Sequence, residues 1–599
     1  SSVTLNNTQA TVWSNHGLDI VTKTMTQSGG KIQSQDDMSI KADNLSQSNS
    51  MLVAKQGNMN LNIRGDLSNK GNGNGKDITE SGLILAGKDL TVTAGNVSNT
   101  QGNVIAAHID VNASNSVNNQ KGQIAASNTL VITAKSLTQS DSATLSAMNG
   151  QTLTISTVLD NNGSTIVSNN GLDIDAQTFI NDGGKIVANN SIADISVTGR
   201  LDNRNDAVIQ ADTVLLNAND VHNNSQASIN AIKNMQLSSK TGLDNQGGQL
   251  VSQGGMTLNL NGKALNNQAG LVSSQQALNV NASSINNQAG SIETAGALGL
   301  ISAGQLNNTG GRMVGNGITF NTQSVNNQGG NVISNAGLSI QNSADFNNNK
   351  GYVYANTGIG ITAKNITNTE GTIKSLGNIG LQAANQLDNS KGWIGSNADV
   401  TLKANKVINN GTLDANNIAM GIQGNNVSVT TQNLDNIGGK IIATDKAALL
   451  VENQINNQKG SISSDGQIII QKSDGTAMAL VDNRDGSIVA KDNTIFKTKQ
   501  VLNDGGELVF GDNLSLDIAG DYTQTGVLQA GNDANITIGG HLTNEGTLEA
   551  QNNLNLKAND LTNMDDAKIV AGQNTNIDVK NTINNYGLID GTNTTIHTS

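Results

Sequence analysis

The sequence contains no cysteine and no proline, and only 2% of its 599 residues are aromatic. The absence of cysteine excludes disulfides, thiol catalysis and cysteine-ligated metal sites. A core of large rings is not available, yet 36% of the residues are hydrophobic, which is too many for a disordered chain. No apolar run approaches the ~18 residues that a membrane-spanning helix needs, so no integral membrane segment is expected.

Basic charge is also scarce. The net charge is −13 and the sequence pI is about 4.8, with 34 Lys and Arg residues scattered along the chain. A nucleic-acid-binding protein needs a basic stripe that neutralises phosphates, so we expect no nucleic-acid partner. The chain begins Ser1-Ser2-Val3 without a signal peptide, and we interpret it as an internal fragment of a longer protein.

The dominant pattern is a repeat in which an apolar anchor is followed by a polar corner. We find 28 anchors from Val3 to Ile583, including Ile180 and Leu502, and almost every gap is 19 to 22 residues. No change in composition marks a boundary, so the repeat predicts one continuous domain over residues 1–599. The three longer gaps predict loop insertions near residues 70–82, 421–433 and 471–479.

Each repeat has two strand signals. Segments such as LNVNA (278–282) and LNLKA (554–558) alternate apolar and polar residues, which indicates a strand with one buried face. An earlier strand follows the repeat's glycine, as in Gly184-Lys-Ile-Val-Ala, and helical periodicity is missing. A unit of this size cannot bury its apolar face alone, so the units are expected to stack. The predicted fold is an all-β, right-handed parallel β-helix (a solenoid) of about 28 turns of roughly 20–22 residues.

The second residue after most anchors is asparagine, and these asparagines are expected to stack at one corner. An amide both donates and accepts hydrogen bonds, so a ladder of amides satisfies itself along the axis. We therefore interpret the column as structural, with a ligand-binding role as the alternative. The glycine three residues later, as in Gly270 and Gly290, is expected to let the chain bend into the next strand. The predicted ladder includes Asn245, Asn267, Asn287, Asn308, Asn327, Asn348, Asn368 and Asn389.

The corner sequences resemble the repeats of the filamentous haemagglutinin family. The pattern of that family is similar to Leu-Asp-Asn-Arg-Gly-Gly-x-Ile-x-Ala followed by Leu-x-Leu-x-Ala. More than twenty copies in register cover essentially the whole chain. Three of them read Leu201-Asp-Asn-Arg, Leu434-Asp-Asn-Ile-Gly-Gly-Lys-Ile-Ile-Ala and Val481-Asp-Asn-Arg-Asp-Gly-Ser-Ile-Val-Ala.

The resemblance implies a large exoprotein of a Gram-negative bacterium, located outside the cell at its surface and exported by two-partner secretion. The implied partners are a dedicated outer-membrane transporter during export and a receptor on a target cell. The family includes adhesins and the CdiA-type effectors of contact-dependent growth inhibition, in which similar repeats form a stick that holds a receptor-binding region away from the cell. We recognise neither a secretion domain nor a toxin domain in the sequence.

The sequence offers little for catalysis, and we expect neither an enzyme nor a cofactor. The five histidines do not lie at metal-ligand spacing, and no cluster of Asp or Glu joins them. A carbohydrate-active β-helix enzyme would need carboxylates that converge on one face. We predict that no column of the coil holds three such carboxylates. The densest charged stretch, from Arg200 to Asp206, is interpreted as a solvated corner.

One aromatic cluster is a candidate surface-binding patch. Tyr352, Tyr354 and Trp393 take outward positions because Val353 and Ile394 take inward ones. Tyr352 and Trp393 both follow the repeat's glycine and are two turns apart, about 10 Å. Exposed rings on one face are suited to contact a glycan or a protein partner, whereas scattered surface aromatics are the alternative.

The repeat and the resemblance together predict a rigid, monomeric, extracellular rod that spans distance and presents other regions of its protein. An adhesin whose own β-helix surface binds glycans or protein receptors is the alternative. A carbohydrate-active β-helix enzyme is the least favoured interpretation.

Overall fold

A computed structural model of the protein describes residues 3–72, 82–414 and 420–598. Every regular element in these ranges is a β-strand, and equivalent strands of successive turns pair in parallel. The chain divides into two compact units, Ser1–Ala303 and Gly304–Ser599. Both units are coils of stacked strands, of about 28 turns in all, which confirms the predicted all-β parallel β-helix.

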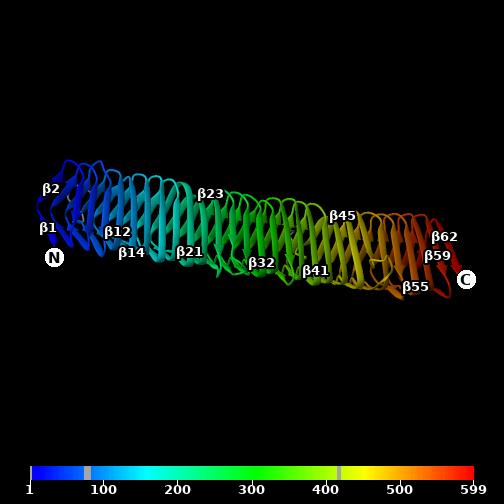
Figure 1. Ribbon diagram of the computed structural model, residues 1–599. Coiled ribbons are helices and arrows are strands. Elements are labelled where there is room, and N and C mark those ends of the chain that lie inside the picture. Colours follow the sequence, from blue (N-terminus) through cyan, green and yellow to red (C-terminus); the bar gives the residue numbers. More distant parts are fainter. Residues whose placement is uncertain (1–2, 73–81, 415–419, 599) are drawn as a thin grey trace. The chain divides into compact units, whose positions relative to one another are not determined.

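The first unit is built from turns of which many carry three short strands, whereas in others two strands are joined into one, as in β12 (Asp89–Thr100) and β14 (His108–Gln120). Strands of one turn pair in parallel with their equivalents in the next turn, so the backbone hydrogen bonds between them run along the coil axis. Figure 1 shows the strands stacked in this way. Two successive turns comprise β24 (Leu243–Asp244), β25 (Gln249–Ser252) and β26 (Met256–Asn259), then β27 (Leu265–Asn266), β28 (Leu271–Ser274) and β29 (Leu278–Ala282).

The second unit has the same architecture. In several of its turns the second and third strands join into one longer strand, because no break separates them. Two successive turns comprise β38 (Tyr352–Ala355) and β39 (Gly358–Thr367), then β40 (Thr372–Ser375) and β41 (Asn378–Asp388), with β38 paired to β40 and β39 to β41.

The core consists of columns of aliphatic side chains. Leu250, Val272 and Ile292 occupy one register position in successive turns of the first unit and are fully buried. Alternation along each strand turns the neighbouring residues outward. Stacked aliphatic columns thus supply the buried apolar surface that this aromatic-poor chain cannot obtain from rings. The right hand of the coil and the continuity of the two units as one domain stay predictions.

Three predicted anchors are wrong by one or two positions. At two of these corners, adjacent residues are both apolar, and strand alternation admits only one of them to the core. The residue that enters is the one paired in register with the anchors of neighbouring turns and placed two residues before the buried amide. The observed anchors are Leu5, Phe179 and Val501, in place of Val3, Ile180 and Leu502.

The structure also relocates one predicted loop. Residues 421–433 lie within β44 (Gly421–Asp435), where Ile422 pairs with Ile394 of the preceding turn. Thr412 is buried at the position that glycine takes elsewhere, and residues 415–419, which precede the strand, lie outside the described ranges. Residues 472–477 lie between β47 (Gln467–Gln471) and β48 (Met478–Asp482). The predicted loop near residues 70–82 falls mainly on residues 73–81, outside the described ranges.

A column of asparagines lies inside each unit, at the corner that follows the anchor. In the first unit, Asn245 Nδ2 donates to Asn267 Oδ1, and Asn267 Nδ2 donates to Asn287 Oδ1, each at 2.7 Å. All of the asparagines predicted for the ladder are 0% exposed, so their side chains are closed to a ligand from solvent. In the second unit the same 2.7 Å bond joins, in order, Asn308, Asn327, Asn348, Asn368 and Asn389.

Each ladder amide also fastens the backbone. Asn267 Nδ2 lies 3.2 Å from the carbonyl oxygen of Gly270 in its own turn and 3.0 Å from that of Ser291 in the next turn. A buried amide left without partners would cost ~1–3 kcal/mol. The ladder therefore closes each corner and holds the next turn in register. Where glutamine replaces asparagine, as at Gln139, the chain of amides continues.

The glycine three residues after the ladder amide is required by space, and its predicted role in bending the chain is wrong. The positive φ of this corner belongs to the preceding residue and is 53° at Ala269 and at Ala289. A Cβ added to Gly270 would overlap the carbonyl oxygen of Asn245 and lie 2.7 Å from Asn267 Oδ1. The absence of a side chain at Gly270 lets one turn approach the ladder of the turn before it.

Replacing Asn267 by Asp is expected to open the coil locally. The carboxylate would face three hydrogen-bond acceptors, the Asn287 side chain and the carbonyls of Gly270 and Ser291. An uncompensated buried charge costs ~3–5 kcal/mol, which corresponds to at least ~100-fold faster amide hydrogen exchange by local opening. The control Asn279→Asp, at an exposed outward position of β29, should leave exchange unchanged; equal protection in both variants would contradict the structural role.

Replacing Gly270 by Ala is expected to destabilise the same region through overpacking, by ~1–3 kcal/mol. The matched control is Gly360→Ala, because a Cβ at Gly360 meets no atom within 4 Å and the backbone there is not left-handed. Gly360→Ala should be neutral or slightly stabilising. Limited proteolysis compares the two: new cleavage near residue 270 is expected only for Gly270→Ala, and similar resistance of both variants would contradict the steric explanation.

Candidate surface-binding site

The aromatic residues singled out in the sequence lie on one face of the second unit. Tyr352 on β38 pairs with Thr372 on β40, which pairs with Trp393 on β42 (Trp393–Ser396). In the neighbouring outward column, Tyr354 pairs with Lys374. We call the side chains of Tyr352, Tyr354, Trp393 and Lys374 the aromatic patch.

The two tyrosine rings of the aromatic patch are stacked and nearly parallel. Their centroids are 6.3 Å apart and their planes differ by 12°. The hydroxyl of Tyr354 donates to Asn356 Oδ1 at 2.7 Å, which holds that ring in position. Tyr352 remains 36% exposed, so the stacked pair presents a ring to solvent.

Trp393 lies against the sheet beside a basic group. A Cβ on Gly395 would lie 2.5 Å from Trp393 Nε1, so the ring occupies the space that a side chain at Gly395 would need. Lys374 Nζ is 5.2 Å from the Trp393 ring centroid, within range of a cation–π interaction. The ammonium group keeps donors that a ligand can use, because the interaction with the ring occupies none of its protons fully.

The protonation of Tyr352 reflects this packing. Partial burial raises the pKa of the Tyr352 phenol above its ordinary value, and the neighbouring Tyr354 raises it further. The Tyr352 phenol is therefore a neutral donor and acceptor at physiological pH, without charge that would repel an anion.

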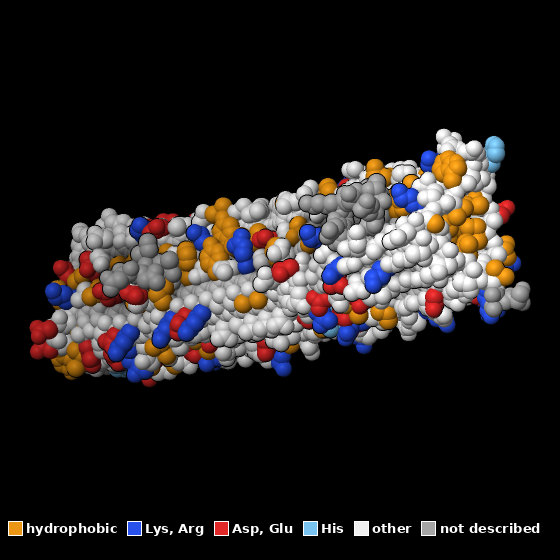
Figure 2. Space-filling view, turned by 90° about the vertical axis from the view of Figure 1, so that its left-hand side faces the viewer, with side chains coloured by type: hydrophobic (Ala, Val, Ile, Leu, Met, Phe, Trp, Pro, Cys, Tyr) orange, Lys and Arg blue, Asp and Glu red, His pale blue; other side chains and the backbone are white. Residues whose placement is uncertain are grey.

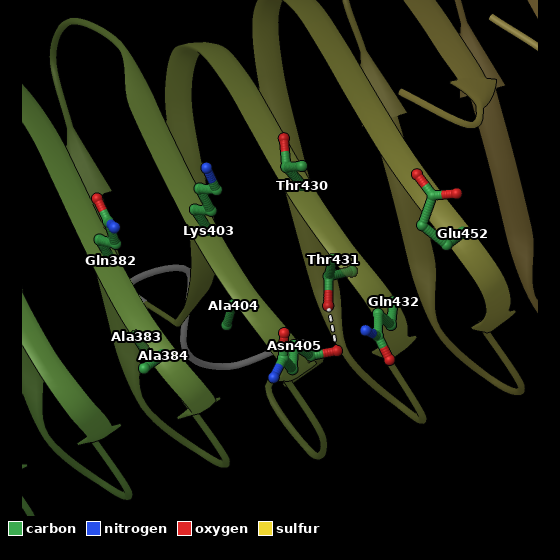
Figure 3. Close-up of a pocket in the computed structure, with 10 residues that line it drawn as sticks. All are labelled: Gln382, Ala383, Ala384, Lys403, Ala404, Asn405, Thr430, Thr431, Gln432 and Glu452. Carbon is green, nitrogen blue, oxygen red and sulfur yellow. Dashed lines mark hydrogen bonds between the residues drawn. The ribbon is translucent and has the colours of Figure 1, made fainter. Parts of the chain in front are cut away.

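A second surface feature is a shallow groove of about 260 Å³ on another face of the second unit, lined by both alanine and polar side chains. Figure 3 shows Lys403 and Glu452 at separate sides of it. Thr431 Oγ1 donates to the backbone carbonyl of Asn405 at 3.0 Å, and Glu452 accepts a 2.7 Å bond from Ser473. These polar groups already serve the coil, so the groove has less to offer a ligand than the aromatic patch.

The first unit brings three carboxylates onto one face, but they belong to two outward columns and no single column holds all three. Asp173 and Asp175 lie on one face of β20 (Leu172–Asp182), and Asp194 of β21 (Lys185–Arg204) is the register partner of Asp173. Burial raises the pKa of Asp173, and the charges of Asp175 and Asp194 raise it further.

Two of the three carboxylates, those of Asp173 and Asp194, border an open hollow of about 530 Å³. Thr152, Thr154 and Ser196, which pair in register with Asp173 or Asp175, are uncharged. No basic side chain therefore stands next to these carboxylates in their columns. A carbohydrate-active enzyme needs acidic groups set in distinct roles by their surroundings. The three carboxylates lie close together, but their surroundings do not set them in distinct acid and base roles.

The charged corner at Arg200 to Asp206 is an ion-pair cluster rather than a solvated corner. Asp202 is 1% exposed and lies 2.8 Å from Arg200 and 3.7 Å from Arg204. The same Asp-x-Arg pairing recurs at Asp482 and Arg484, at 2.7 Å. Burial opposes ionisation of Asp482, but hydrogen bonds from Arg484 and Gln458 outweigh it and lower the pKa of Asp482. The Leu-Asp-Asn-Arg motif is therefore a structural corner motif.

The remaining surface carries mixed charge. Figure 2 shows acidic and basic side chains interspersed among uncharged polar groups on the face that it displays. Within residues 3–72, 82–414 and 420–598, no group of three or more His, Asp or Glu side chains is arranged to hold a metal ion. Among the residues that the structure describes, there is no helix long and apolar enough to cross a membrane.

Comparison with known families gives one result that covers nearly the whole chain. A family model described as the haemagglutinin repeat matches twelve overlapping or adjacent segments. No curated protein and no solved structure matched the chain. The matched segments are residues 2–71, 65–134, 104–157, 146–205, 194–263, 257–310, 314–383, 382–421, 422–472, 477–546, 509–564 and 547–599.

The packing of the aromatic patch predicts how Tyr352 titrates. Tyr354→Ala should lower the pKa of Tyr352 more than Tyr354→Phe does, because Ala removes both the covering ring and the neighbouring phenol, whereas Phe keeps the cover. The pKa is measured from phenolate absorbance, as the difference from matched variants that also carry Tyr352→Phe. An equal effect of Ala and Phe would show that burial by the Tyr354 ring is not the main cause.

Proposed function

Because the chain belongs to the haemagglutinin repeat family, we propose that it is the stalk of a secreted bacterial exoprotein and presents other regions of that protein at a distance from the cell surface. The observation that carries the proposal is that, within each unit, each described turn holds the next. Backbone ladders, aliphatic columns and amides all link a turn to its neighbours along the axis. A stalk needs length and stiffness, and this construction supplies both without a specific site.

The family supports a proposal about export and location. Haemagglutinin-repeat proteins are typically secreted and found outside the cell or at its surface, and the coil fits a structural or adhesive protein. We propose export through an outer-membrane transporter by two-partner secretion. Vectorial export suits a chain whose contacts are between adjacent turns, since each turn folds onto the one before it. Within the family, a role in contact-dependent growth inhibition is our finer proposal, with a target-cell receptor as the partner of the presented region.

An adhesin whose coil surface itself binds a ligand is the second candidate. It is favoured by one specific observation, the aromatic patch, which the stalk function does not require. An enzyme is supported less well, because the acidic cluster at Asp173 has no basic neighbour in its columns.

In-register shortening tests the stalk. Deleting residues 161–266 removes five turns and joins Asp160 to Asn267, so that the ladder and strand registers are restored. The purified variant should remain folded, and its maximum dimension in X-ray scattering should fall by about 24 Å, from the ~4.8 Å spacing of strands. In bacteria that secrete the protein, adhesion should decrease gradually as turns are removed.

The control deletes residues 161–256, which joins Asp160 to Thr257 out of register. This variant should lose its compact fold, because a shifted register places apolar residues on the outside. Complete loss of adhesion after the in-register deletion, with export and folding intact, would contradict a purely spacing role for these turns.

A further inference from the structure

We propose that the aromatic patch is a binding surface for a carboxylated saccharide, such as a chain of uronic acids. The rings of Tyr352, Tyr354 and Trp393 would pack against the apolar faces of the sugar rings, and Lys374 would pair with a carboxylate. This function goes beyond that of a stalk, which needs no ligand on its surface.

The geometry of the rings suits a short length of sugar chain. Tyr352 and Trp393 occupy the same outward column with Thr372 between them, so their strands are separated by ~9.6 Å, twice the interstrand spacing. A disaccharide can bridge this distance and contact both rings. Sugar rings present C–H groups on their faces, and aromatic faces, which carry partial negative charge, attract such groups.

The rings are also held in place before a ligand arrives. Tyr354 is fixed by its stacking on Tyr352 and by its bond to Asn356. Trp393 is seated over Gly395 and under Lys374. Because the strands of the coil fix the spacing between the rings, binding costs little ordering of the protein.

The local charge favours an acidic ligand. The strands β35 (Asn331–Ser334), β38, β40 and β42 contain no Asp or Glu, whereas the chain as a whole carries a net charge of −13. Lys374 is the basic group at the centre of this surface. The carboxylate of Glu370, at the adjacent corner, lies 3.7 Å from Lys350, which reduces its repulsion of an anion.

The chain contains a natural control for the contribution of neighbouring rings. Its other tryptophan, Trp13 on β2 (Thr11–Ser14), also has a lysine over the ring, with Lys55 Nζ 4.3 Å from the centroid. The register partner of Trp13 is Gln33 on β5 (Lys31–Ser34), and neither strand holds another aromatic residue. Trp13 and Lys55 therefore combine one ring and one cation, without the neighbouring rings of the aromatic patch.

The test measures binding of galacturonic acid oligomers to the full chain by calorimetry, beside their methyl esters, in which the carboxylates are uncharged. The unmodified oligomers should bind, and Lys374→Gln should weaken them about tenfold, as expected for loss of a hydrogen bond to a charged group. The methyl esters should bind more weakly and should be insensitive to Lys374→Gln. Added salt should weaken only the charged oligomers.

Variants of the rings define the site. Tyr352→Ala with Trp393→Ala should abolish measurable binding, and Gly395→Ala, which keeps all the rings but displaces Trp393, should weaken it. Trp13→Ala with Lys55→Gln should leave binding unchanged. Circular dichroism checks that each variant keeps its strands. If Trp393→Ala unfolds the turn, the single variant Tyr352→Ala, at an exposed position, replaces the double variant in the test.

Three results would overturn the proposal. They are an absence of binding by the unmodified chain, binding that survives loss of the rings, and equal affinity for the acidic and esterified oligomers. Capture of a protein partner by the aromatic patch, without any affinity for the oligomers, is a case of the first of these results. None of these results bears on the stalk, whose test depends on the number of turns.

Discussion

A buried primary amide has two protons and an oxygen that must all find partners, and in this protein the partners lie in the adjacent turns. Asn267 accepts from Asn245, donates to Asn287 and reaches backbone carbonyls of its own turn and of the next. The amide is satisfied only if the two neighbouring turns are present in the correct register. Since an unsatisfied buried amide is costly, the ladder specifies the length of a turn and the alignment of its strands, while insertions are confined to places that do not disturb it.

The other compositional features follow from the same constraint. Glycine is needed where a turn passes close to the ladder, because a Cβ at Gly270 would collide with the carbonyl of Asn245. Proline would remove a backbone donor from a ladder that uses every strand, so its absence suits a coil without free interior positions. Small aliphatic side chains fill most of the narrow core, and some of the few large rings that enter it, such as Phe179 and Tyr522, do so at the anchor position. Burial keeps the Tyr522 phenol neutral and raises its pKa far above the ordinary value.

Periodicity made the fold and the amide ladder predictable, because alternation along strands and a fixed turn length are properties of the sequence alone. The choice between adjacent apolar residues, as between Phe179 and Ile180, was not predictable from hydrophobicity and depended on the position of the amide two residues later. The role of Gly270 was also missed, since spatial crowding between turns leaves no local signal, and the loop near residues 421–433 was misplaced because a spacing locates an insertion only to within one turn. The outward directions of Tyr352 and Trp393 followed from alternation, whereas the position of Lys374 beside Trp393 required the register.

The division between inward and outward positions also explains where binding can evolve in such a protein. Inward residues pack against both neighbouring turns, so a substitution there must be accommodated by other residues of the same column. Outward residues contact mainly solvent. Side chains about twenty residues apart in the sequence become neighbours on this surface, and the backbone fixes the distance between them. Three substitutions at outward positions are therefore enough to place rings at regular intervals without disturbing the coil. The aromatic patch has this form: Val353, Ile373 and Ile394 continue the buried column beneath it, while the residues beside them depart from the polar surface found elsewhere. A stalk built in this way can acquire a ligand without a new domain, because rigidity needed for length also preorganises the site.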